Sequence, residues 1–165
     1  MTAVSNTSPL NYLLLIGEAR VLPAIFGKLH VPSAVRDELL APEAPEPVRQ
    51  WASAPPEWVQ LHTVKGELPA PVALHRGETE AILLARELSA DALLMDELDG
   101  RAVARQHGLT VIGTLGVLDL AAAQRLLDFR EAWQRLRATS FRTAPRLVAE
   151  LLARDQARRG QGKAK

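Results

Sequence analysis

Apolar residues along this chain follow two alternating patterns. Short apolar runs, typical of buried strands, precede longer stretches in which apolar residues recur every three or four positions, typical of amphipathic helices. The predicted strands lie around Val4 and over "KLHVP", "EWVQLHTV", "DALLM" and "LTVIG". Strands that alternate with helices predict βαβ units, whose strands are parallel. We therefore expect an α/β fold with a mostly parallel central sheet.

Helices are predicted between the strands and over most of the C-terminal third. They cover "PLNYLLLIG", "EARVLPAIFG", "PSAVRDELLA", "HRGETEAILLAREL", "DGRAVARQHG", "TLGVLDLAAAQRLL", "DFREAWQRLRAT" and "APRLVAELLARDQARR". Ser8, which precedes Pro9, and Ser33 are predicted N-caps because a serine hydroxyl can accept an orphan backbone N–H. The proline-rich residues 42–57 are predicted to form a loop with one helical turn around 48–52.

Length and composition indicate one soluble domain. A chain of 165 residues can bury a sizeable core but is short for two comfortable domains. We expect the main domain over residues 1–140, followed by a C-terminal helix and basic tail over 141–165. The absence of cysteine excludes disulfides and thiolate metal sites, and no apolar stretch is long enough for a membrane span. These features predict a cytoplasmic protein without a membrane partner.

Charge is distributed unevenly although the net charge is only +1. The middle of the chain is acidic, whereas the segment from Arg125 onward is rich in arginine and ends in "ARRGQGKAK". A basic terminus can hold a phosphate backbone. The more common explanation for such a segment is a solvated helix end with a frayed tail, and the sequence leaves both open.

Oxygen-bearing side chains lie at the ends of several predicted elements. They are Asn6 after the first strand, Glu38 on a short helix, Glu78 and Glu80 at the start of a long helix, Asp96 after "DALLM", and Asp99 just beyond it. Parallel strands end at the same edge of a sheet, so Asn6 and Asp96 should be close if their strands are neighbours. A cluster of hard oxygen donors suits Mg²⁺ or Mn²⁺, which can activate water for attack on a phosphodiester.

Each of these acids taken singly has a structural explanation that is more common than a functional one. The helix dipole favours Glu78 in a first turn, and Asp99 could cap the helix that it precedes. Glu78 and Glu80 point to different sides of their helix, so both cannot be direct ligands without distortion. The joint placement of the acids, rather than any one of them, favours a metal site.

Five short segments in order resemble the PIN-domain superfamily of metal-dependent nucleases. They are "VSNTSPL" (4–10), "VPSAVRDEL" (31–39), "GETEAILLARE" (77–87), "ALLMDE" (92–97) and "GLTVIGTLGVL" (108–118). More closely, the chain is similar to a branch of predicted nucleic-acid-binding proteins that contain a PIN domain. The resemblance covers about the first 120 residues. It implies an α/β/α sandwich around a mostly parallel sheet, with acidic residues in a cleft at the strand ends.

The resemblance also assigns residues to the site. The family's first acid falls on Asn6, followed by hydroxyls at Thr7 and Ser8, and its second acid falls on Glu38. The third falls on Glu78, with Glu80 as a rival, and the fourth on Asp96, with Asp99 as an auxiliary ligand or water-orienting group. Asn6 departs from the family's acid, and an amide oxygen binds a cation more weakly than a carboxylate does.

The resemblance implies a Mg²⁺- or Mn²⁺-dependent endoribonuclease, the toxin of a toxin–antitoxin pair or a relative of one. Its partners would be an RNA substrate and a cognate antitoxin protein, and a homodimer is expected. The alternative is a nucleic-acid-binding or regulatory module that kept the fold and lost efficient cleavage. A nucleotide-binding regulator of Rossmann type fits less well, because no glycine-rich phosphate loop follows the first strand.

Overall fold

A computed structural model describes residues 1–163 of the chain, and Ala164 and Lys165 of the predicted basic tail lie outside the described residues. The chain forms two compact units, Met1–Thr114 and Leu115–Lys165. The first unit contains the sheet, and the second is helical. The domain boundary expected near residue 140 stays a prediction.

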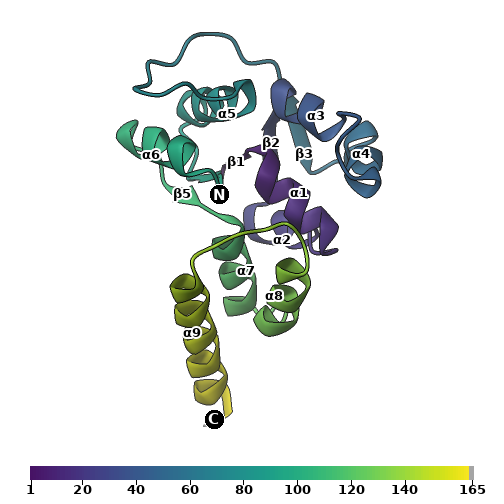
Figure 1. Cartoon of the computed structure of the whole chain (residues 1–165), viewed down its shortest axis with the longest axis vertical. Coiled ribbons are helices and arrows are strands. Elements are labelled where there is room, and N and C mark those ends of the chain that lie inside the picture. Colours follow the sequence, from purple (N-terminus) through teal and green to yellow (C-terminus); the bar gives the residue numbers. More distant parts are fainter. Residues whose placement is uncertain (164–165) are drawn as a thin grey trace. The chain divides into compact units, whose positions relative to one another are not determined.

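A five-stranded sheet forms the centre of the first unit, in the order β3-β2-β1-β4-β5 (Figure 1). The strands are β1 (Ala3–Ser5), β2 (Leu29–Pro32), β3 (Val59–His62), β4 (Ala92–Leu94) and β5 (Val111–Ile112). Every neighbouring pair is parallel. The predicted α/β class with a parallel central sheet is therefore confirmed.

Six helices of the first unit flank the sheet. They are α1 (Thr7–Leu15), α2 (Val21–Phe26), α3 (Ser33–Leu39), α4 (Glu46–Ser53), α5 (Arg76–Glu87) and α6 (Leu98–Gln106). Helix α5 packs on β1, β2 and β4, and its apolar face joins the buried Val4, Leu93 and Met95. This packing places the first turn of α5 beside the carboxyl ends of the two central strands.

Strands β1 and β4 are neighbours, as the sequence predicts. Ser5 pairs with Leu94, and the next backbone amide, that of Asn6, donates to the Leu94 carbonyl at 2.9 Å. The chain turns into α1 directly after Asn6 and toward α6 after Met95. The two turns therefore leave the sheet at the same edge and bring their polar residues together.

Two predicted N-caps are wrong, and one predicted helical turn is longer than expected. Helix α1 begins at Thr7 and α3 at Ser33, so Ser8 and Ser33 lie inside their helices and neither is an N-cap. Both hydroxyls instead donate to glutamates that are distant in the sequence, and such contacts depend on the tertiary fold. The segment expected to hold one helical turn forms the two-turn helix α4, because Pro47 fits the first turn of a helix.

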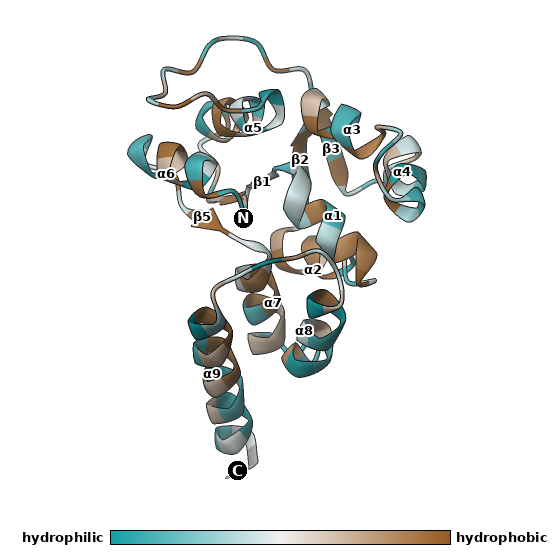
Figure 2. Ribbon diagram, viewed as in Figure 1, coloured by the Kyte–Doolittle hydropathy of each residue, from teal (hydrophilic) through white to brown (hydrophobic). Residues whose placement is uncertain are grey.

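The second unit contains α7 (Thr114–Ala123), which begins at the last residue of the first unit, and α8 (Phe129–Arg137) and α9 (Pro145–Lys163). Asp128 caps α8 by accepting a hydrogen bond from the Glu131 amide at 3.1 Å. Apolar and polar residues alternate along α9 (Figure 2). Within residues 1–163, no helix combines the length and apolar character that a membrane span needs.

Candidate functional site

Asn6 lies at the centre of the polar edge of the sheet and is only 2% exposed. Its Nδ2 donates to Glu97 Oε2 at 3.0 Å. Its Oδ1 is buried and has no hydrogen-bond partner among residues 1–163. A buried amide oxygen without a partner is costly. The atom is therefore well suited to a ligand that accepts its lone pair.

The two hydroxyl residues after Asn6 hold two carboxylates. Thr7 Oγ1 donates to Glu38 Oε2, and Ser8 Oγ donates to Glu97 Oε1. Both residues lie in the first turn of α1, so the start of this helix orients one glutamate from α3 and another from the β4–α6 turn. The small polar residues after β1 thus organise the acids that surround Asn6.

Glu78, in the first turn of α5, completes this group and is 7% exposed. Burial raises the pKa of its carboxyl, and the charges of Glu97 and Glu38 raise it further. The backbone hydrogen bond and charge of His75 oppose these effects. Glu97 and Glu38 are therefore close enough to Glu78 for their charges to act on it, as carboxylates do in sites that bind a cation.

Glu80 is buried as well but serves a different part of the fold. Its Oε1 accepts from the Ala34 amide at 3.2 Å and the Ser33 hydroxyl at 3.4 Å, and its Oε2 pairs with Arg76 at 2.7 Å. It holds the N-terminus of α3 against α5. The two glutamates diverge as their spacing on the helix requires, and it is Glu78 whose pKa responds to Glu38 and Glu97.

Asp96 lies beside this group and is oriented by the start of α7. The Thr114 amide donates to its Oδ1 at 2.7 Å, and the Thr114 hydroxyl donates to its Oδ2 at 2.6 Å. Burial raises the pKa of Asp96 while these two hydrogen bonds lower it, and the charge of Glu97 adds to the rise. Asp99 lies exposed in the first turn of α6.

Gly77 permits the close approach of α5 to Glu38. A Cβ atom at this position would lie 2.5 Å from Glu38 Oε1 and 2.9 Å from its Cδ. These contacts are shorter than any normal packing distance, so a side chain here would displace the carboxylate. The glycine of "GETE" is therefore part of what places Glu38 beside Glu78.

Sequence reasoning missed Glu97, which is the acid that contacts Asn6. It selected Asp96 from the pair "DE" after β4, yet adjacent residues at the end of a strand tend to point to opposite sides. One acid of such a pair faces Thr114 and the other faces Asn6. The doublet itself is the signal that could have identified both.

The donor set suits a hard cation. Asn6 Oδ1 and the carboxylates of Glu38, Glu78 and Glu97 are all oxygen ligands, the type that Mg²⁺ and Mn²⁺ prefer. Across the described part of the chain, no three carboxylates or imidazoles already have the arrangement of a metal site. Binding of a cation would therefore have to bring these side chains closer together. The charges of Glu97 and Glu38 oppose their approach to Glu78, and a bound cation would offset that repulsion.

Two comparisons with known proteins found a match for this chain. A family model described as a PIN domain matches residues 2–157. A solved structure of a PilT N-terminus domain protein from the hyperthermophilic archaeon Sulfolobus solfataricus P2 is similar at 16% identity and a TM-score of 0.48. The match covers 87% of this chain and 100% of that one. No curated protein matches the chain.

Proposed function

We propose that this chain, which belongs to the PIN-domain superfamily, is a metal-dependent ribonuclease that hydrolyses RNA phosphodiester bonds with Mg²⁺ or Mn²⁺. The observation that carries the proposal is the buried, partnerless Oδ1 of Asn6, whose amide contacts Glu97, together with the charges of Glu97 and Glu38 that act on the buried Glu78. An oxygen-lined group of this kind has an obvious occupant in a divalent cation. Such an ion supplies charge stabilisation and water activation in phosphodiester cleavage.

The residues that would hold the ion are Asn6, Glu38, Glu78 and Glu97, with Asp96 at the edge of the group. Asp96 stays in the proposal because a carboxylate oxygen that accepts one hydrogen bond can still bind a cation. The Thr114 hydrogen bonds to it are of the type that orients ligating carboxylates. Asp99 stays a proposed auxiliary residue. Its side chain is exposed, so it could contact a bound ion or its water only from the solvent.

The chain's own residues prepare the site before any substrate arrives. Thr7 fixes Glu38, and Ser8 and the Asn6 amide fix opposite oxygens of Glu97. These hydrogen bonds fix the orientation of the two carboxylates, as the partners of metal ligands do. Preorganised groups cost less to arrange during the reaction.

A groove of about 360 Å³ opens beside Glu38 and offers room for substrate. Thr7, Asn11, Glu38, Glu43 and Pro45 line it, together with buried apolar side chains of α3 and α4. Single-stranded RNA is recognised through its splayed bases and its backbone. A groove beside Glu38 with room for such a strand supports RNA as the substrate class.

The toxin role is part of this proposal and follows from the family resemblance. It includes a cognate antitoxin protein as partner and a homodimer as the working form. Production of the wild-type chain in a bacterial host should arrest growth, whereas Glu78→Gln should not. Equal growth with both chains would remove the toxin role and leave the nuclease role standing.

A second candidate function is nucleic-acid binding with little or no cleavage. Asn6 favours it, because its amide supplies no charge to a cation and its Nδ2 already occupies one oxygen of Glu97. A site with one fewer carboxylate holds metal more weakly. Cleavage assays that supply abundant Mn²⁺ separate the two candidates.

The decisive assay measures cleavage of single-stranded RNA by the full chain with Mn²⁺, with Mg²⁺, and with excess chelator. Wild type should cleave with either metal and stop with chelator, and Glu78→Gln or Glu97→Gln should lose at least about tenfold in rate. Glu87→Gln is the matched control, because it changes an acid at the last residue of the same helix. Cleavage that is equal in Glu78→Gln and wild type, or absent with both metals in wild type and Asn6→Asp, would contradict the proposal.

A further inference from the structure

The second unit contains a cleft of about 1050 Å³ that the site described above does not use. Its lining comes from the end of α7, the start of α8 and the last turns of α9, and includes Ala122, Arg125, Leu127, Asp155, Arg158 and Arg159. Three arginines therefore face one cavity. Apart from two alanines at the end of α7, the lining residues belong to the arginine-rich segment that starts at Arg125.

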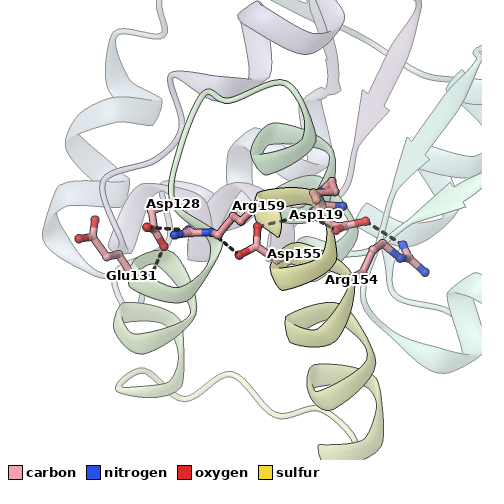
Figure 3. A network of polar contacts seen from close by, with 7 residues as sticks. Asp119, Asp128, Glu131, Arg154, Asp155 and Arg159 are labelled. Atoms are coloured by element: carbon pink, nitrogen blue, oxygen red, sulfur yellow. Dashed lines mark hydrogen bonds and ion pairs between the residues drawn. The ribbon is translucent and has the colours of Figure 1, made fainter. Parts of the chain in front are cut away.

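Most of the charges around this cleft cancel in a network of ion pairs (Figure 3). Asp119 pairs with Arg154 and Arg158 at 2.9 Å each. Asp155 pairs with Arg159 at 2.9 Å and with Arg158 at 3.5 Å. The network thereby fixes the guanidinium groups of Arg158 and Arg159 in the cleft wall.

Asp128 extends the network by pairing with Arg159 at 2.7 Å. Three aspartates thus neutralise Arg154, Arg158 and Arg159. Arg125 is the charge left over, since no acid among residues 1–163 forms an ion pair with it. The cleft therefore has a surplus positive charge at a known position.

The backbone at Arg125 is unusual for an arginine. Its φ is +60°, in the left-handed region that favours glycine. The Arg125 amide donates to the Ala122 carbonyl and the Leu126 amide to the Ala121 carbonyl, the pair of bonds that ends a helix in a Schellman motif. This position usually holds glycine, so the arginine is strained there. The Arg125 side chain reaches the α9 side of the cleft. One of its guanidinium nitrogens would lie 4.0 Å from a Cβ atom added at Gly162.

The two units differ in net charge, and the basic unit is the one that attracts a polyanion. Met1–Thr114 has nine Lys and Arg against fourteen Asp and Glu, a net charge of −5. Leu115–Lys165 has eleven against five, a net charge of +6. An acidic nuclease unit repels an RNA backbone except where a cation is bound, so the attraction for a polyanion has to come from the other unit.

We propose that this cleft is a phosphate-binding site for the backbone of single-stranded RNA, with Arg125 as the residue that contacts the phosphate. The inference rests on the proposed ribonuclease function and names a second place where the substrate is held. Guanidinium groups bind phosphate oxygens through paired hydrogen bonds. Because Arg158 and Arg159 are already paired with aspartates, Arg125 is the guanidinium of the cleft that is left to bind the ligand. An acidic polypeptide is the competing occupant.

The test measures binding of a fluorescent single-stranded RNA of roughly ten nucleotides by anisotropy at several salt concentrations. The full chain carries Glu78→Gln so that cleavage does not interfere. Adding Arg125→Gly should weaken binding roughly three- to tenfold and reduce the salt slope by about one phosphate contact. Its melting temperature should stay equal or rise, because glycine relieves the positive φ. Arg125→Lys should restore part of the affinity.

Arg137→Ala is the matched control, because Arg137 is an exposed arginine of the same unit at the end of α8, outside the cleft. It should change RNA affinity by less than about twofold. Arg125→Gly that binds RNA as tightly as Arg137→Ala would overturn the proposal. A polyglutamate peptide that binds in an Arg125-dependent way while RNA does not would overturn it as well and identify a protein partner.

The outcomes also separate this inference from the nuclease proposal. Cleavage of RNA by wild type, with binding that ignores Arg125, would contradict only the phosphate site. Binding that depends on Arg125, with no metal-dependent cleavage, would contradict only the nuclease.

Discussion

Asn6 is the residue whose chemistry sets the strength of the proposed site. Its Oδ1 is buried without a partner in the described chain, and its Nδ2 donates to Glu97. An aspartate here would add a ligand charge and remove that donor. The added charge should strengthen metal binding, whereas the lost donor should lower the stability of the metal-free protein. Substitution at this position therefore tests metal binding and stability separately.

We predict that Asn6→Asp binds Mn²⁺ at least about tenfold more tightly, because a carboxylate attracts the cation more strongly than an amide. Without metal the same variant should be about 1–3 kcal/mol less stable to unfolding, because Glu97 loses a donor and gains a like charge. Calorimetry and urea unfolding measure the two quantities. Gln60→Glu, which adds the same charge on β3 at the far edge of the sheet, should leave Mn²⁺ affinity unchanged.

The two buried glutamates of α5 should separate function from stability. Glu78→Gln is expected to weaken Mn²⁺ binding about tenfold, or about 1.4 kcal/mol, without lowering stability, because it removes a repelled charge. Glu80→Gln is expected to leave Mn²⁺ affinity within about twofold and to cost about 1–3 kcal/mol of stability, because it weakens charge-assisted bonds to α3 and Arg76. The reverse pattern in calorimetry and unfolding would make Glu80 the ligand.

Residue patterns in the sequence identified Asn6, Glu38 and Glu78 as candidates, but they could not show how each acid is used. The hydroxyls of Thr7 and Ser8 looked like helix-start residues, and only the fold shows that they hold Glu38 and Glu97. These partners are 31 and 89 positions apart in sequence. No local pattern encodes a hydrogen bond across such a separation.

At the scale of elements, the contact between α5 and α3 decides where Glu38 lies. Gly77→Ala places a Cβ 2.5 Å from Glu38 Oε1, so either the helix or the carboxylate has to move. We predict weaker Mn²⁺ binding, together with a loss of at most about 1 kcal/mol in unfolding free energy, because the displaced atoms are the end of a flexible side chain. Gly160→Ala on α9, where nothing lies within 4 Å, should not destabilise the chain. Unchanged stability and Mn²⁺ affinity in Gly77→Ala would contradict this account of the helix contact.

The edge strand β3 and its neighbour β2 are linked by a pair of histidines, with His30 Nδ1 2.8 Å from His62 Nε2. Burial lowers the pKa of His30, and the charges of His62 and Lys28 lower it further. Unfolded chains protonate His30 at its ordinary pKa of 6.5, so the pair contributes stability above that pH. The contribution is lost as the pH falls through the lower pKa of the folded state.

We therefore predict that the urea concentration at the unfolding midpoint of wild type decreases as the pH is lowered from about 8 to about 5.5. His62→Gln should fall less over the same range, because the histidine pair no longer exists. His107→Gln, which removes an imidazole outside the pair, should follow wild type. A His62→Gln chain with the full pH dependence of wild type would show that other groups cause it.

The order of strands and helices could be predicted because hydrophobic periodicity is local. Element ends were less predictable. The helix expected over "TLGVLDLAAAQRLL" stops at Ala123, where Arg125 adopts the left-handed conformation without being a glycine. Helix α4 forms in a proline-rich segment because its proline occupies the first turn. The ends of these helices depend on turns that tertiary packing imposes, and the residue types that usually mark such turns are absent.

At the scale of the whole molecule, charge is divided between the two units. The sheet unit is acidic, as a cation site requires, and the helical unit is basic, as contact with a polyanion requires. The sequence showed this asymmetry as a basic segment from Arg125 onward. It could not show that aspartates neutralise Arg154, Arg158 and Arg159 and leave Arg125 in excess.

Anomalous diffraction from a crystal grown with Mn²⁺ locates the ion and so decides whether Asn6 and its neighbouring acids form a metal site. We predict a peak in contact with Asn6 Oδ1 and with carboxylate oxygens of at least two of Glu38, Glu78 and Glu97. The peak should be absent from a Glu78→Gln crystal grown in the same way. A peak held by Glu80 instead, or no peak near Asn6 with Mn²⁺ in excess, would show that these residues do not form the metal site.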